Sequence, residues 1–177
     1  MRKLTLYTAA TLDGYIAGPN GELDWLDITA TDPQQPDYGY NAFMDSIDTT
    51  IQGTTTYQLA AHFNKDPYPG KTNYVFTRAT PPPPDSGVWR FITGDIATFV
   101  RTLKQEDGAG IWLVGGGQIN TVMLNAGLID EIVVTLFPVV LGNGIPLFAP
   151  GADRSEFHTL SSESYETGLV QWTMLKG

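Results

Sequence analysis

The sequence feature that most constrains the fold is the apolar run Ile-Trp-Leu-Val at 111–114, which leads directly into three glycines. A short apolar run without a polar face is typical of a strand buried on both sides, as strands are in parallel sheets covered by helices. After the glycines, apolar side chains recur at helical spacing from Ile119 to Ala126, and Gly127 ends the pattern. This stretch therefore predicts a buried strand, a glycine turn and a helix, the repeating unit of an α/β fold.

The same order of strand, turn and helix recurs along the chain up to residue 130. We expect strands at 4–9, 49–52, 73–77, 88–92 and 111–114, and helices within 38–47, from the threonines after Gly53 to Phe63, and from a cap at Thr93 or Asp95 to Gly108. The proline-rich stretch between two of these strands is expected to be a surface loop, because proline cannot join a sheet interior.

From residue 131 the pattern changes to strand-like runs only. These runs are 131–142, 145–148, 156–165 and 169–176, and residues 166–168 turn the final pair. Alternating units followed by such a meander predict a three-layer α/β/α sandwich whose central sheet is mainly parallel with antiparallel C-terminal strands. The sequence contains neither an internal repeat nor a domain linker, so we expect a single domain over residues 1–177.

Composition and charge exclude several classes of protein. The chain has no cysteine, which excludes disulfides and thiolate metal sites, and its two histidines have no metal-site spacing, so no metal is expected. No apolar run of signal-peptide length follows Arg2 and Lys3, so we expect a cytoplasmic protein that does not enter a membrane. With 19 acidic and 10 basic side chains the protein repels phosphate backbones, so nucleic acid is not an expected partner.

Positive charge is missing from a long N-terminal stretch. Residues 4–64 carry eight acidic side chains and no lysine or arginine. A ligand bound by this third of the chain receives no positive charge from it, which matters for any substrate that carries a phosphate.

The glycines at 115–117 are the strongest candidate for a phosphate site. Glycine has no Cβ, so a phosphate can approach the backbone, and the free amides and dipole of the following helix favour negative charge. The alternative is a tight turn that binds no ligand. The stretch is not the Rossmann fingerprint, because the third glycine is adjacent and no GxGxxG spacing follows the first strand.

Three other places are candidates for the same ligand. Gly53 and the threonines at 54–56 form a second turn from strand to helix, although a threonine cap would explain them as well. Asp13 and Gly14 follow the first strand, where loops of an α/β sheet face the ligand crevice, and a plain Asp-Gly turn is the alternative. Arg78 ends a strand, where its guanidinium would either fork onto a phosphate or extend into solvent.

The four tryptophans are expected mainly in the core. Trp25 is the exception, because it stands in a polar early loop and could line a pocket. No Ser-His-Asp arrangement for nucleophilic catalysis is recognisable.

Five motifs occur in a characteristic order: TLDGYIAG at 11–18, GTTTY at 53–57, VFTR at 75–78, LVGGG at 113–117 and LIDEIVVTLFPVVLGNGIPLF at 128–148. Together they resemble the dihydrofolate-reductase-like (DHFR-like) proteins related to the reductase, or C-terminal, domain of the bifunctional riboflavin-biosynthesis protein RibD. The resemblance extends over about residues 2–175, and its last motif is the most specific. It implies a DHFR-like fold, an NADPH site, a small-molecule substrate and a homodimer.

By position, the resemblance assigns most of the candidate residues to the cofactor. It implies Gly115, Gly116, Gly117 and Gln118 beside the dinucleotide phosphates and nicotinamide, Gly53, Thr54, Thr55 and Thr56 at the pyrophosphate, Thr77 and Arg78 at the adenosine 2′-phosphate, and Ala10, Asp13 and Gly14 beside the nicotinamide. The family usually reads GRxTY where this chain has GTTTY, so a cation expected near the adenosine phosphate is missing. NADPH is the implied cofactor, with NADH as the alternative.

The resemblance also implies an NAD(P)H-dependent oxidoreductase. Such an enzyme moves a hydride to a C=N or C=O bond of a small heterocyclic substrate, pterin-like or pyrimidine-like, while the protein supplies position, dryness and a proton. Asp37 resembles in its place the substrate-binding acid of dihydrofolate reductases, and it is the candidate proton donor or anchor, with Asp13 as a second candidate catalytic residue. For Asp37 a helix cap beside Pro36 is the alternative.

Two other functions stay open. The first is the 5-amino-6-(5-phosphoribosylamino)uracil reductase of riboflavin biosynthesis, but residues 4–64 offer no cation for its phosphate, which favours a neutral or pterin-like substrate. The second is a non-catalytic dimeric cofactor-binding or scaffold protein, because a fold does not guarantee a function. A measurement of catalytic turnover would distinguish the non-catalytic protein from either reductase.

Overall fold

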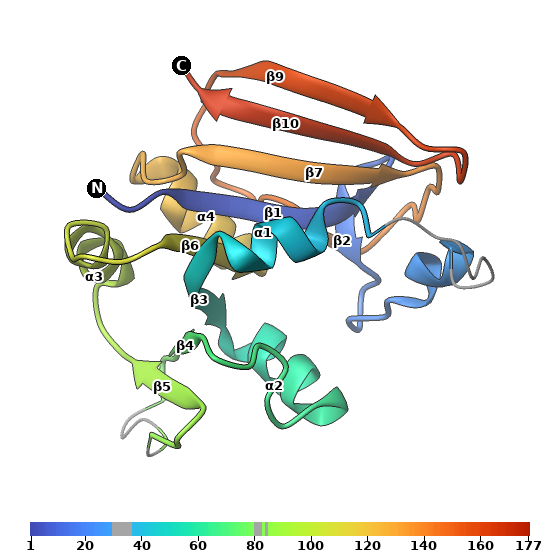
Figure 1. Ribbon diagram of the computed structural model, residues 1–177. Helices are drawn as coiled ribbons and strands as arrows, with labels where there is room; N and C mark the ends of the chain where they lie inside the picture. The colour runs from blue at the N-terminus through green and yellow to red at the C-terminus, as the bar shows by residue number, and fades with distance from the viewer. Residues whose placement is uncertain (30–36, 80–82, 84) are drawn as a thin grey trace.

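In the computed structural model, which describes residues 1–29, 37–79, 83 and 85–177, eight strands form one sheet in the order β5-β4-β3-β6-β1-β7-β10-β9 (Figure 1). The strands are β1 Leu4–Thr11, β3 Ile47–Gly53, β4 Thr72–Phe76, β5 Trp89–Ile92, β6 Gly110–Gly115, β7 Glu131–Phe137, β9 Phe157–Ser164 and β10 Val170–Lys176. Neighbours from β5 to β7 are parallel, whereas β10 is antiparallel to β7 and β9. The predicted mainly parallel sheet with antiparallel C-terminal strands is confirmed.

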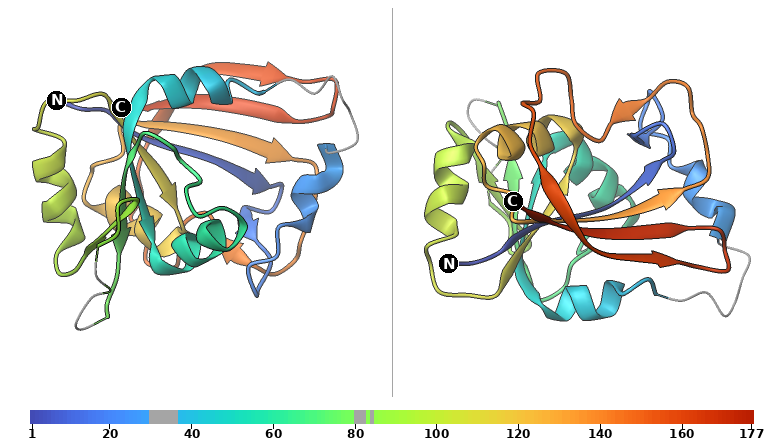
Figure 2. Two further views of the ribbon diagram at one scale, coloured as in Figure 1. Left: turned by 60° about the horizontal axis from the view of Figure 1, so that its bottom comes forward. Right: turned by 90° about the horizontal axis from the view of Figure 1, so that it is seen from above.

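Helices cover both faces of this sheet (Figure 2). They are α1 Tyr40–Asp45, α2 Thr54–Phe63, α3 Ile96–Leu103 and α4 Gly117–Asn125. In β6, Ile111 and Leu113 pack in the core under α3 and α4, and Trp112 packs on the opposite face with the α1 and α2 side chains. Because successive strand residues point to opposite faces, this apolar run is buried on both sides, and the predicted three-layer sandwich is confirmed.

A second, smaller sheet joins two distant loops. It pairs β2 (Tyr15–Ala17) antiparallel with β8 (Ile145–Pro146), and a 3-10 helix, η1 (Asp24–Thr29), follows β2. The expectation that the run at 145–148 belongs to the terminal meander is therefore wrong. β7 also differs from a simple meander strand, because it extends the parallel sheet beside β1.

The first helix is shorter than its spacing predicts. The expected helix within 38–47 is limited to Tyr40–Asp45, and Tyr38 and Gly39 before it have φ values of 52° and 78°. Ile47, the last residue at helical spacing, instead begins β3 and is 3% exposed. Burial within the sheet overrides the local helical pattern here.

Candidate functional site

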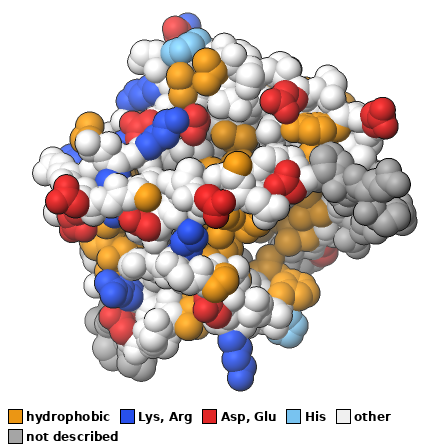
Figure 3. All heavy atoms as spheres, in the orientation of Figure 1, with side chains coloured by type: hydrophobic (Ala, Val, Ile, Leu, Met, Phe, Trp, Pro, Cys, Tyr) orange, Lys and Arg blue, Asp and Glu red, His pale blue; other side chains and the backbone are white. Residues whose placement is uncertain are grey.

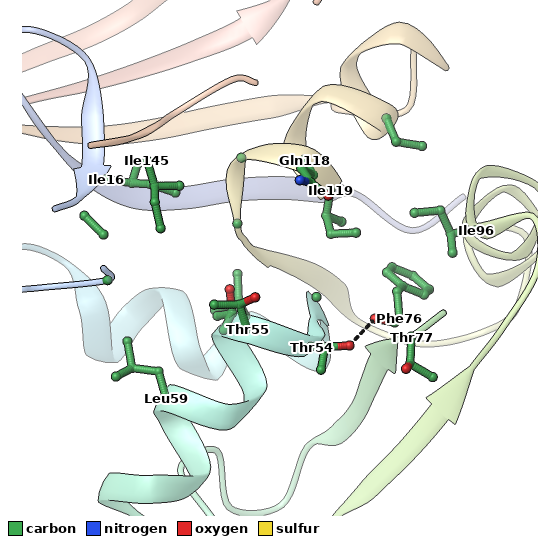
Figure 4. A pocket seen from close by; sticks show the side chains of 18 of the residues that line it. Ile16, Thr54, Thr55, Leu59, Phe76, Thr77, Ile96, Gln118, Ile119 and Ile145 are labelled. Carbon is green, nitrogen blue, oxygen red and sulfur yellow. Dashed lines mark hydrogen bonds between the residues drawn. The ribbon is translucent and has the colours of Figure 1, made fainter. Parts of the chain in front are cut away.

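A cavity of about 900 Å³ opens at the edge of the sheet where the parallel strands end. Its walls come from the segments that follow β3, β4, β5 and β6, together with parts of β2 and β8, and we call it the strand-end cavity. In Figure 4, Ile16 and Ile145 lie on one side of this space and Ile96 and Phe76 on the other. The predicted cofactor residues that line it are Gly53, Thr54, Thr55, Thr56, Thr77, Arg78, Gly116, Gly117 and Gln118.

The three glycines after β6 have three different surroundings. Gly115 has a φ of 110° and joins Gly116 through a cis peptide bond. Gly117 is packed so closely against the carbonyl oxygen of Pro146 that no side chain would fit there. A Cβ on Gly116 would meet nothing nearer than Thr56 Oγ1 at 3.5 Å, and its backbone borders the cavity. Gly116 is therefore the glycine whose missing side chain leaves room for a ligand.

Two helices begin at this cavity without a capping side chain. Gly53 precedes α2 and Gly116 precedes α4, and neither N-terminus has a side-chain cap hydrogen bond. The idea that threonine hydroxyls cap α2 is wrong, since Thr54 Oγ1 donates to the Phe76 carbonyl at 3.1 Å. The free amides and the dipole at such an N-terminus attract anions. The strand-end cavity is bordered by two N-termini of this kind.

The third helix at this edge, α3, has its N-terminus capped by a side chain of its own segment. Asp95 caps α3, as one of the two predicted caps: its carboxylate accepts hydrogen bonds from the amides of Ala97 and Thr98 at 3.0 and 3.1 Å. The hydrogen bond from the Thr98 hydroxyl, with those from the two amides, lowers the pKa of Asp95. The first turn of α3 is therefore already bonded to a carboxylate, which leaves α2 and α4 for an anionic ligand.

Arg78 is the one lysine or arginine among the described residues that line the strand-end cavity. It follows Thr77 at the end of β4, its side chain is exposed, and it forms no ion pair with any other described residue. Its guanidinium is thus available for a phosphate at this edge.

A second cavity, of about 460 Å³, lies on the sheet face that carries α1, and we call it the aromatic cavity. Its aromatic wall residues are Tyr7, Tyr38, Tyr40, Tyr68, Trp112 and Phe137. Figure 3 shows hydrophobic side chains gathered in a hollow below α1, on the face seen in Figure 1. This cavity is built from side chains on strand faces and on the segments beside them, in contrast to the backbone turns at the strand ends.

The aromatic wall is held by contacts within the protein. Tyr7 stacks on Phe43 with ring centroids 4.3 Å apart, and Tyr68 meets Trp112 edge to face at 5.1 Å. Trp112 Nε1 donates to the Tyr7 carbonyl at 2.9 Å, and the Tyr7 hydroxyl donates to the Tyr38 carbonyl at 2.8 Å. The wall is therefore formed before any ligand arrives, as in most small-molecule sites.

The two cavities meet where β1 and β6 separate. The ladder between these strands reaches the pair Leu6–Leu113, whereas β1 continues along β7. Beyond that pair, Thr8, Leu23 and Val114 line both cavities. The two cavities therefore adjoin each other at these three residues.

Asp37 lines the aromatic cavity and is exposed. Its carboxylate oxygens accept hydrogen bonds from the amides of Asn41 and Gly39, each at 3.1 Å. These bonds, with the one from Asn41 first, lower the pKa of Asp37 below its ordinary value, so the group is ionised at neutral pH. In this state it accepts hydrogen bonds and has no proton to donate.

Four predicted site residues line neither cavity: Ala10, Asp13, Gly14 and Gly115. The Asp13 carboxylate accepts hydrogen bonds from Thr11 Oγ1 at 2.6 Å and from the amides of Leu141 and Gly142 at 3.2 and 2.7 Å. The bond from Thr11, more than the backbone bonds, lowers the pKa of Asp13. Asp13 thus fastens the loop after β7 to the end of β1.

The aromatic wall is the part of the site that the sequence does not predict. Trp25, the tryptophan expected to line a pocket, is 5% exposed, packs edge to face on Phe137 at 5.1 Å and lines neither cavity. Trp112 is in the core, as expected, and it also lines the aromatic cavity. The one sequence pattern that points to this wall is the alternation of side chains along β1, which puts Tyr7 on one face of the sheet. The strand order that brings Tyr7 beside Trp112 cannot be predicted from either segment alone.

The described residues contain neither a candidate metal site nor a candidate membrane-spanning helix. Within them, no group of three or more histidine, aspartate or glutamate side chains is arranged to hold a metal ion. No helix in the described part of the chain is long and apolar enough to cross a membrane.

Comparisons with known proteins agree with this geometry. The family model of the RibD C-terminal domain matches residues 2–171. The uncharacterized protein YwjB of Bacillus subtilis (strain 168) is 42% identical over 151 residues, which are 83% of this chain and 83% of YwjB.

Two solved structures illustrate the likeness in fold. A putative riboflavin biosynthesis protein from Shewanella sp. PV-4 superposes with a TM-score of 0.85 at 28% identity, covering 100% of this chain and 99% of that one. The dihydrofolate reductase of Enterococcus faecalis, in complex with NADP(H), superposes with a TM-score of 0.68 at 16% identity, covering 99% of this chain and 96% of that one.

Proposed function

Because the chain belongs to the RibD C-terminal domain family, we propose that it is a reductase that transfers a hydride from NADPH or NADH to a C=N or C=O bond of a small heterocyclic substrate. The observation that carries this proposal is the junction at Thr8, Leu23 and Val114, where the strand-end cavity adjoins the aromatic cavity. Hydride transfer needs the donor and acceptor carbons in direct contact within a site that excludes water. Two adjoining cavities, one suited to phosphates and one to rings, support that chemistry.

The residues of the strand-end cavity fit a dinucleotide. The open backbone at Gly116 and the uncapped N-termini of α2 and α4 suit a pyrophosphate, and Ile16 and Ile145 offer apolar cover. In this proposal the groups that hold the cofactor are Gly53, Thr54, Thr55, Thr56, Thr77, Arg78, Gly116, Gly117 and Gln118. Ala10, Gly14 and Gly115 do not line the cavity, and in this proposal they contribute indirectly: Ala10 and Gly14 shape the end of β1 and the loop after it, and Gly115 shapes the glycine turn after β6.

Arg78 is the proposed ligand of the 2′-phosphate that distinguishes NADPH from NADH. The Thr54 side chain stands where relatives usually have arginine, and its hydroxyl is bonded to Phe76. Arg78 is then the described cation that lines the cavity and has no other partner among the described residues. We therefore propose NADPH as the preferred cofactor.

A bound reduced nicotinamide would supply the hydride, and the residues of this chain supply the remaining functions. The rings of Tyr7, Tyr40 and Trp112 orient a flat substrate and keep bulk water, though not one proton-donating water molecule, away from the junction. The ionised Asp37 accepts a hydrogen bond from a ring N–H and acts as the anchor, so the proton that completes the reduction comes from water. Asp13 acts as a positioning residue, because it holds the loop that leads to β8.

The test is a parallel titration of the purified protein with NADPH and NADH, followed by nicotinamide fluorescence and thermal stabilisation. A ligand present at about 100 times its Kd stabilises the native state by about 2.7 kcal/mol, so binding raises the melting temperature measurably. We expect both cofactors to bind, NADPH more tightly, and the bound NADPH to be oxidised when a suitable C=N or C=O acceptor is added.

Failure of both cofactors to bind would refute the reductase proposal and favour the non-catalytic alternative. Binding without oxidation, over a panel of pterins and aminopyrimidines with and without phosphate, would keep the cofactor site and contradict the proposed reaction.

A further inference from the structure

The described walls of the aromatic cavity contain one charged side chain, and that charge is negative. The side chain is Asp37, and around it stand tyrosine, tryptophan, phenylalanine and leucine side chains, including Leu26 and Leu169. The inference below rests on the proposed function, in which this cavity takes the substrate.

Three phenols of the wall, those of Tyr7, Tyr40 and Tyr68, add no positive charge and stay protonated. Burial raises the pKa of Tyr7 and Tyr40, and it raises the pKa of Tyr68 to about 12. The Tyr7 hydroxyl already donates to the Tyr38 carbonyl, so the hydroxyls of Tyr40 and Tyr68 are the donors of this set that remain for a ligand. They can bind a neutral heteroatom, but they cannot neutralise a bound anion.

Two cations that lie in space near the C-terminal end of α1 are already bonded elsewhere. Lys71 Nζ donates to the carbonyls of Met44 and Ile47, each at 2.8 Å, so it closes the C-terminal end of α1. Arg2 is 8% exposed and is paired with Asp48. Neither side chain lines the aromatic cavity.

The segment before α1 that the structure does not describe, residues 30–36, has no cationic side chain to offer to this cavity. Residues 30–36 contain no lysine, arginine or histidine, and neither lysine nor arginine occurs anywhere in 4–64. The contrast with the strand-end cavity is direct, because that cavity has Arg78 and two uncapped helix N-termini.

We propose that the aromatic cavity selects substrates by charge: it accepts a flat heterocycle that carries neither phosphate nor carboxylate, and it rejects the anionic form of the same ring. A phosphate or carboxylate placed among these rings would lose water without gaining a cationic partner, and it would face the Asp37 carboxylate. The proposed substrate is therefore an unphosphorylated heterocycle, which separates this chain from a reductase of phosphoribosyl-aminopyrimidines.

The test compares two probes that differ in one carboxylate, pterin and pterin-6-carboxylate. Their affinities for the full-length protein, in its solution oligomeric state and without cofactor, are measured by calorimetry near neutral pH, where pterin is uncharged. We expect pterin to bind at least roughly tenfold more tightly than the carboxylate. Equal or tighter binding of the carboxylate, whether through a partner subunit or another cation, would overturn the proposal, and so would absence of pterin binding.

A pair of variants tests the cause of the selection. Tyr40→Lys puts a cation into the wall at an exposed helix position, and we expect it to narrow or reverse the preference for pterin. Ala42→Lys adds the same charge to the same helix outside the wall and should leave the preference unchanged. Asp37→Asn, a milder change, should improve carboxylate binding a few-fold through loss of repulsion. Equal effects of the two lysines would assign the selection to net charge and overturn the proposal.

These measurements need neither cofactor nor turnover. Failure of the charge preference together with normal NADPH binding would leave the proposed reductase intact and reopen the phosphorylated substrate. If the preference for pterin over its carboxylate is retained but neither cofactor binds, the opposite follows. The aromatic cavity would still be a charge-selective ligand site, and the proposed reductase function would be refuted.

Discussion

The strand-end cavity and the aromatic cavity adjoin each other on one sheet, but they are built from different groups. The first is formed by turns that follow strands, with backbone amides, glycine, threonine hydroxyls and Arg78. The second is formed by side chains on the faces of β1, β6 and β7 and on the segments beside them, with aromatic rings and the carboxylate of Asp37. Backbone amides are unpaired at strand and helix ends, whereas inside a sheet they are bonded to neighbours.

This difference shows how one small sheet can separate two kinds of recognition. In the proposed function, anionic groups bind where main-chain donors are free, and rings bind where side chains are presented. The junction at Thr8 and Val114 would bring the two kinds of ligand into contact. Changes on one side should therefore leave binding on the other side largely unaffected.

The largest effect is expected from Gly116→Val. The backbone of Gly116 has a φ of −80°, which valine adopts, but its side chain would fill the space that borders Thr56 and Ile16. We expect NADPH and NADH affinity to fall by about 100-fold or more while pterin binding is retained. Parallel fluorescence and calorimetric titrations measure both.

Gly87→Val is the matched control. A Cβ at Gly87 would have no atom within 4 Å, and this glycine lacks a positive φ and lies outside both cavities. The control variant should bind cofactor as the unmodified protein does. Normal cofactor affinity in Gly116→Val would show that the dinucleotide does not use the glycine turn.

A smaller effect is expected from Arg78→Ala. Loss of the guanidinium should weaken NADPH binding by about tenfold and change NADH binding little, because only NADPH carries the 2′-phosphate. Arg90→Ala is the control, since Arg90 is an exposed arginine on β5 that lines neither cavity. Equal losses for both cofactors would remove Arg78 from 2′-phosphate recognition.

The smallest expected effect is a difference in pH dependence between the cavities. The pKa of Asp37 is lowered from 3.8 and those of Tyr7, Tyr40 and Tyr68 are raised from 10.0, so the aromatic wall keeps its charge from weakly acidic to neutral pH. Pterin binding should stay constant there, whereas NADPH binding should weaken a few-fold as its phosphate takes up a proton near pH 6. Titrations across this range check both, and a loss of pterin affinity towards acid pH would contradict the assigned charge state.

Much of the fold is predictable because short-range patterns and burial agree. The apolar run of β6 is buried on both faces, and the glycine and threonine turns follow β6 and β3 as expected. The errors come from contacts across the sheet. Ile47 leaves its helical pattern to pack beside Trp112, and the Thr54 hydroxyl bonds to Phe76 on the neighbouring strand and leaves its helix uncapped.

The site is predictable in one half only. The groups proposed to bind phosphates belong to single turns, so glycines and threonines in one short segment indicate them. The aromatic wall joins side chains from β1, β6 and β7 with those near α1, and Tyr7 and Trp112 are 105 residues apart. No local pattern in the sequence specifies which of several aromatic residues will face the same space.

The bonds from Leu141 and Gly142 to Asp13, and the pairing of β8 with β2, also have a consequence for folding order. Asp13 and Gly142 are separated by 129 residues, so the loop they close has a high entropic cost and forms after the local strand-helix units. Ile16 and Ile145, which this closure brings together, complete the strand-end cavity. A partly folded chain would therefore lack the finished cavity. In hydrogen exchange, we expect dinucleotide binding to slow the exchange of the β2 and β8 amides at lower dinucleotide concentrations than it slows the exchange of the amides in the central strands.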